Sequence, residues 1–129
     1  MQDRPSPSEI IGAVAAFLKN VVAPDTTGVT SFQARVAANA LEMMKRELDT
    51  APAEDAAELA RLKTLLSADA SLFDLNVELC RRIEAGEVDL ATPGLKDHLW
   101  MTTLAKLAVD QPTYGGYRAA LAERSGSKS

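Results

Sequence analysis

Apolar residues recur at every third or fourth position along most of the chain, and this spacing constrains the fold more than any other feature. No window alternates apolar and polar residues for long enough to indicate a half-buried strand. Prolines, glycines and short polar runs divide the pattern into about five segments of helical length. The sequence therefore predicts an all-α fold, a single-domain bundle of about five helices.

Local start and stop signals place these helices. Ser6 can cap the first helix, Pro7 suits its first turn, and Glu9 can reach back to complete a capping box. Pro24 is expected to end that helix, because proline cannot continue the ladder of backbone hydrogen bonds. The remaining helices are expected at residues 30–48, 53–66, 72–85 and 92–110, with Gly86 as a left-handed cap after the fourth.

The size and composition of the chain fit one globular domain. Its 129 residues, of which 47% are hydrophobic and 25% charged, suffice for one apolar core. We expect residues 1–124 to form that domain and residues 125–129 to be a disordered tail. The net charge of −4 argues against binding to nucleic acid or to an anionic membrane surface.

The sequence favours a cytoplasmic location. The N-terminus has no cationic start followed by an apolar run, so a signal peptide is not expected. The longest apolar stretch, residues 10–18, is about half of what a bilayer crossing requires. The single cysteine, Cys80, has no partner for an internal disulfide, and its simplest role is that of a small core residue.

Several polar residues interrupt the apolar faces of the predicted helices. Arg35 and Asn39 lie one turn apart at the edge of one face, and Asn76 lies near the middle of another. A buried amide without a partner costs about 1–3 kcal/mol. We therefore expect Asn76 to bond to Asn39, to Arg35 or to a backbone carbonyl near a helix end.

These polar residues have two interpretations. In the first, Arg35, Asn39, Asn76, Lys106 and His98 surround one pocket, where the cations hold an anionic metabolite or acyl-CoA and the amides orient it. In the second, the amides only set how the helices pack, and the cations lie along apolar surface. Buried polar networks without ligands are common, which favours the second interpretation.

The sequence favours a non-enzymatic role over an enzymatic one. Phosphate-binding loops, dinucleotide-binding glycine patterns and nucleophile elbows are absent from the sequence, and no cofactor or metal is expected. The only histidine, His98, has neither a nucleophile to activate nor other metal ligands nearby in sequence. We expect it to be an ordinary, partly exposed residue.

Three stretches, "FQARVAANALEMMKREL", "LNVELCRRIEAGE" and "LAKLAVDQP", follow an opening "DRPSPSEIIGAVAAFL". In that order they resemble a bacterial family of short uncharacterised helical proteins, over nearly the whole chain to about Tyr114. Members of this family are often encoded beside a phosphotransferase of the aminoglycoside/choline-kinase type and an acyl-CoA dehydrogenase. The resemblance implies a setting in bacterial acyl-CoA or small-molecule metabolism, and it carries over no catalytic residues.

The function predicted from the sequence is that of a non-catalytic accessory or protein-binding helical protein. The kinase-like phosphotransferase and the acyl-CoA dehydrogenase are the partners that the resemblance implies. The alternative is a helical bundle that binds a small anionic ligand through Arg35, Asn39, Asn76 and Lys106. Wide apolar arcs on the second and fifth predicted helices are also compatible with a homodimer.

Overall fold

A computed structural model describes residues 4–126 of the chain. Helices supply the regular structure of these residues, and no strand occurs among them, which confirms the all-α fold. Their contacts divide the chain into two compact units, which for the described residues span 4–50 and 51–126. The expectation that residues 1–124 form a single domain stays a prediction.

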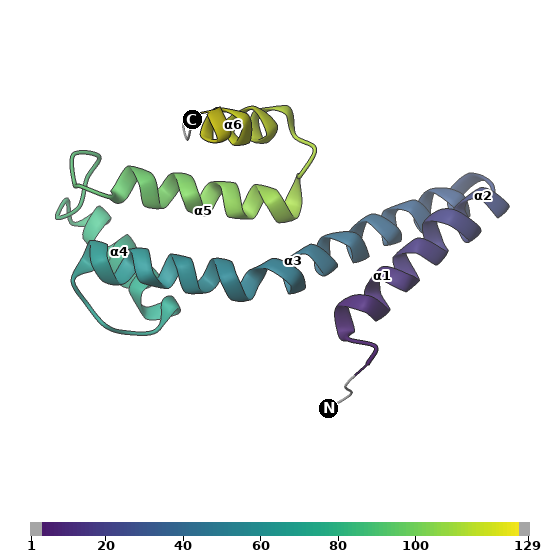
Figure 1. The fold of residues 1–129 in the computed structure, drawn as a ribbon, viewed down its shortest axis with the longest axis horizontal. Helices are drawn as coiled ribbons and strands as arrows, with labels where there is room; N and C mark the ends of the chain where they lie inside the picture. Colours follow the sequence, from purple (N-terminus) through teal and green to yellow (C-terminus); the bar gives the residue numbers. More distant parts are fainter. Residues whose placement is uncertain (1–3, 127–129) are drawn as a thin grey trace. The chain divides into compact units, whose positions relative to one another are not determined.

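The first unit is a helical hairpin (Figure 1). Its helix α1 begins with the predicted capping box, in which the Glu9 N–H donates to Ser6 Oγ at 3.2 Å and the Ser6 N–H donates to Glu9 Oε2 at 2.7 Å. The elements of this unit are α1 (Pro7–Phe17), the π-helical turn η1 (Leu18–Val22), α2 (Ala23–Asp25) and the beginning of α3 (Gly28–Leu66).

The prediction that Pro24 ends the first helix is wrong, because the helix ends one residue later. The helical backbone passes through Pro24 and ends at Asp25, before Thr26 adopts an extended conformation. The π turn ahead of the proline explains this, since the Ala23 N–H donates to Leu18 O, five residues back. The wider turn leaves more room for the proline ring beside the preceding carbonyls.

Small side chains hold the hairpin together. Its buried apolar residues are Ala15, Ala23, Ala34 and Ala38, which let the helices approach closely. Ser31 is also buried, and its hydroxyl donates to Ala23 O at 2.8 Å. Lys19 Nζ forms an ion pair with Glu42 Oε1 at 2.9 Å, and Ser8 donates to Asp49. These pairs set α1 antiparallel to the first part of α3, as Figure 1 shows.

The two helices predicted at 30–48 and 53–66 are one helix, α3, which contains Pro52. The expected break between them is therefore wrong. Proline removes only its own N–H donor, so the carbonyl four residues earlier, that of Leu48, loses one hydrogen bond. Both residues are exposed, and water can replace that bond on the solvent side.

The second unit has a leucine core. Its elements are the rest of α3, α4 (Leu72–Glu84), α5 (Leu95–Asp110) and α6 (Gly115–Gly126), and α6 contacts α5 (Figure 1). Leu62 and Leu75 are its largest fully buried side chains. The buried residues of this core are Leu62, Leu66, Leu75, Leu79, Val88 and Leu95.

Glycines terminate and start helices of this unit. Gly86 has φ of 72°, its N–H donates to Ile83 O at 3.1 Å, and the next N–H donates to Arg82 O at 2.9 Å. This arrangement confirms the predicted left-handed cap of α4. Gly94, with φ of 89°, precedes α5, which begins slightly later than predicted.

The predicted tail at 125–129 lies only partly within the described residues. Helix α6 continues to Gly126, and the Ser125 hydroxyl donates to Leu121 O at 3.0 Å. The remaining residues, 127–129, lie outside the part of the chain that the structure describes.

An acid-sensitive cluster on α4 yields a first testable prediction. The guanidinium groups of Arg81 and Arg82 donate to Glu78 and lower its pKa to about 2. Since the pKa of Glu78 is lower in the folded state, its contribution to stability is present above the ordinary carboxyl pKa. It is lost as the pH falls towards about 2.

We expect Glu78→Gln to lower the melting temperature near neutral pH and the difference from wild type to close as the pH approaches about 2. Thermal unfolding of both proteins across this range provides the measurement. Glu84→Gln, at an exposed position of the same helix, is the control. If the difference in melting temperature between wild type and Glu78→Gln persists unchanged in acid, the stabilising role of the ionised Glu78 is wrong.

Candidate functional site

The five candidate residues lie in different units. Arg35 and Asn39 are exposed residues of α3 in the unit 4–50. Asn76, on α4, and His98 and Lys106, on α5, belong to the unit 51–126. Lys106 is exposed. A shared pocket for all five stays a prediction.

The amide of Asn76 bonds within its own unit. It is half-buried, and Nδ2 donates to Leu72 O at 3.1 Å, which is a backbone carbonyl at a helix start as expected. Nδ2 also donates to Glu58 Oε1 at 2.9 Å. Sequence reasoning did not identify Glu58, which lies on α3. The bond to Glu58 ties α4 to α3, while the bond to Leu72 lies within α4, and together they support a role for Asn76 in helix packing.

Two expectations about burial are wrong. Cys80 is exposed, because α4 turns Leu75 and Leu79 towards the core and leaves the side that carries Cys80 in solvent. His98 is only 3% exposed, because its ring lies between α5 and α3. The single histidine is therefore a buried group with polar neighbours.

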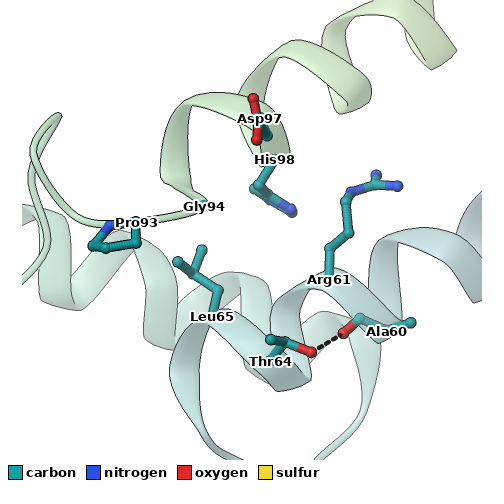
Figure 2. A pocket seen from close by; sticks show the side chains of 8 residues that line it. All are labelled: Ala60, Arg61, Thr64, Leu65, Pro93, Gly94, Asp97 and His98. Atoms are coloured by element: carbon teal, nitrogen blue, oxygen red, sulfur yellow. Dashed lines mark hydrogen bonds between the residues drawn. The ribbon is translucent and has the colours of Figure 1, made fainter. Parts of the chain in front are cut away.

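His98 opens onto a pocket of about 520 Å³ within the second unit (Figure 2). One wall comes from α3, and the other from the start of α5 and the two residues before it. The residues that line the pocket are Ala60, Arg61, Thr64, Leu65, Pro93, Gly94, Asp97 and His98. Figure 2 shows Arg61 extending from α3 towards α5, with its guanidinium near the His98 ring.

Two polar atoms of this pocket are buried without a hydrogen-bond partner among the described residues, His98 Nδ1 and Arg61 Nε. Burial lowers the pKa of His98, and the positive charge of Arg61 lowers it further, while Glu58 opposes the shift. His98 is therefore neutral near pH 7 and presents one N–H donor and one acceptor. Arg61 remains a cation.

A second candidate surface lies on the hairpin, whose large apolar side chains are exposed. On α1 they are Ile10, Val14 and Phe17, and on η1 there is Val21. On α3 they include Met44, Leu48 and a set of four here called the α3 stripe, which is Val29, Phe32, Val36 and Met43. At 100° per residue, the α3 stripe lies on the side of its helix opposite the buried Ala38. The hairpin thus packs its small residues inside and turns its large ones outward.

Asn39 belongs to the α3 stripe by position. The spacing from Val29 through Phe32, Val36 and Asn39 to Met43 alternates between three and four residues. This is the spacing of the seam of a coiled coil, in which a single asparagine selects the register of the partner helix. Arg35 lies beside this seam, one turn from Asn39.

No helix of the described residues is both long enough and apolar enough to cross a bilayer.

The fold defines an all-α protein that combines an alanine-packed hairpin with a leucine-core unit. A family model described as a domain of unknown function, DUF6285, matches residues 24–114, and the chain belongs to this family. The match includes α3, α4, α5 and the pocket. No curated protein and no solved structure matches the chain.

Proposed function

We propose that the protein is a non-catalytic accessory protein of bacterial acyl-CoA or small-molecule metabolism, active in the cytoplasm, which binds another protein through the α3 stripe. The partners proposed are the kinase-like phosphotransferase and the acyl-CoA dehydrogenase that the family resemblance implies. The observation that carries the proposal is the outward orientation of the large apolar residues of the hairpin.

Energetics support a binding role for this surface. Fully burying a side chain such as phenylalanine or valine stabilises a protein by about 1.5–3 kcal/mol. Phe32 is 65% exposed in this chain, so most of that stabilisation is still available to a complex. Contiguous exposed apolar surface of this kind marks interaction sites in other proteins.

The spacing of the α3 stripe indicates what kind of surface binds it. Its seam fits one amphipathic helix of the partner, packed side by side with α3. We expect that helix to place a polar side chain opposite Asn39, because an amide left unpaired in the interface costs about 1–3 kcal/mol. An acidic residue near Arg35 would complement its charge.

The test is to measure binding of each proposed enzyme to the full chain by calorimetry, with Phe32→Asp as the variant. We expect at least tenfold weaker binding, because the substitution places a charge in the apolar seam. Phe73→Asp is the matched control. Phe73 is 76% exposed on α4, which belongs to the other unit, and this change should leave the affinity unaltered.

Equal binding by wild type and Phe32→Asp would contradict the proposal, as would failure of both enzymes to bind. Light scattering tests whether the chain forms a homodimer through the same surface. One combination of results would show that the seam pairs with a second copy of the chain. In that case the wild type is a dimer, the Phe32→Asp variant is a monomer, and neither enzyme binds. The accessory role would then be wrong.

A further inference from the structure

We propose that the pocket between α3 and the start of α5 binds a small monocarboxylic acid, with its carboxylate on Arg61 and His98 and its apolar end against Leu65 and Pro93. This site lies in the second unit and is separate from the α3 stripe. The proposal therefore goes beyond the protein-binding role, and either can hold without the other.

The polar side of the pocket suits a carboxylate. The guanidinium of Arg61 offers donors in a planar fork that matches the two oxygens of a carboxylate. Arg61 Nε and His98 Nδ1 are both buried without partners among residues 4–126, and a buried polar atom without a partner is destabilising. A carboxylate can accept from Arg61 Nε, and from His98 when Nδ1 carries the proton.

The start of α5 adds to this preference. Gly94 caps the helix without a side-chain hydrogen bond, and the Leu95 N–H donates to the backbone oxygen of Thr92 at 3.3 Å. The positive end of a helix dipole favours an anion. Gly94 itself lines the pocket, together with the buried His98, which Figure 2 shows pointing towards Arg61.

The charges around the pocket, to which the nearby Glu58 adds a further negative one, favour a ligand with a single negative charge over one with two. Arg61 supplies a positive charge and Asp97 supplies a negative one, while His98 is neutral near pH 7. A phosphate group carries up to two negative charges at this pH, and the Asp97 carboxylate would oppose the second. A monocarboxylate carries only the charge that Arg61 can neutralise.

The remaining wall is apolar and sets the size of the ligand. Ala60, Leu65 and Pro93 present carbon atoms to the pocket. Its volume of about 520 Å³ lies within the range of about 300–1,000 Å³ found for small-molecule sites. A carboxylic acid with a short aliphatic chain therefore matches both sides of the pocket, and hexanoate is a suitable probe.

The experiment uses the only histidine of the chain as its reporter. Hexanoate is titrated into the full chain, and the imidazole signals of His98 are followed by NMR. We expect a saturable shift with hexanoate and at least tenfold weaker binding of hexanol and of inorganic phosphate. Arg61→Met should weaken hexanoate binding at least tenfold, because the fork of donors is lost.

Lys63→Met is the matched control, since Lys63 lies two residues further along α3, outside the pocket lining, and pairs with Asp69. Its affinity for hexanoate should equal that of the wild type. Circular dichroism checks folding, and Arg61→Gln provides a second variant if Arg61→Met does not fold.

Three results would overturn the proposal: no saturable shift of the His98 signals, hexanol binding as tightly as hexanoate, or unchanged affinity in the Arg61 variants. Tighter binding of phosphate than of hexanoate would also overturn it. The α3-stripe variant Phe32→Asp should bind hexanoate like the wild type, so failure of this proposal and failure of the protein-binding role are distinguishable.

Discussion

Leu62→Ala is expected to destabilise the protein by about 3–5 kcal/mol. Leu62 is fully buried in the core of the second unit, where it belongs to the same cluster as Leu66, Leu75 and Leu79. Truncation removes apolar surface from the core and leaves a cavity that surrounding helices fill only in part. The free energy of unfolding, measured by urea titration and circular dichroism, provides the test.

Leu90→Ala is the matched control for this prediction. Leu90 lies in the same unit, between α4 and α5, but its side chain is exposed. The same chemical change should alter stability by at most about 0.5 kcal/mol there. Similar losses for the two variants would show that the leucine cluster around Leu62 is not the stabilising core of this unit.

Features that depend on neighbours in sequence could be predicted well. The capping box of Ser6 and Glu9 and the left-handed cap at Gly86 both occur as expected. Each involves groups within a few residues of one another, so local geometry decides the outcome. The all-α fold follows from the same local periodicity.

The two prolines show where local rules fail. Pro24 is predicted to end a helix and residues 49–52, which include Pro52, to separate two others, yet both prolines lie inside helical segments. The expectation that proline ends a helix considers the missing N–H donor but not the backbone and solvent around the proline. A preceding π turn accommodates Pro24, and exposure of Pro52 to solvent limits the cost of its missing bond.

The candidate site depended on contacts between helices, which one sequence does not specify. The backbone partner of Asn76 was anticipated, but Glu58 was not. The burial of His98 and its proximity to Arg61 follow from how α5 packs against α3. Arg61 and Leu65 are one helical turn apart, a spacing visible in the sequence, yet nothing local shows which helix faces them.

The hairpin shows a further limit of sequence periodicity. The pattern located a broad apolar arc on the helix that contains Phe32, but periodicity does not reveal what covers an apolar face. In the structure, alanines fill the contact between the helices and the larger residues face outward. The small residues of the same helix, which are easily overlooked beside phenylalanine and methionine, thus mark the intramolecular contact.

Ala38→Leu is expected to destabilise the hairpin by about 1–3 kcal/mol. Ala38 is fully buried, and a larger side chain there must separate the closely packed helices or adopt a strained rotamer. Leucine and alanine have similar helix propensities, so the effect reports packing and not the stability of α3 alone. Hydrogen exchange of the backbone amides of α1 provides the measurement.

Ala40→Leu, at an exposed position two residues further along α3, is the control and should change stability by at most about 0.5 kcal/mol. Equal protection of α1 in both variants would contradict the close packing. Comparing the protection of α1 in Ala38→Leu and in Phe32→Asp then distinguishes residues that fold the hairpin from residues that bind a partner. If Ala38→Leu loosens α1 while Phe32→Asp leaves its protection intact, the hairpin folds through its alanines, and the α3 stripe remains available to a partner.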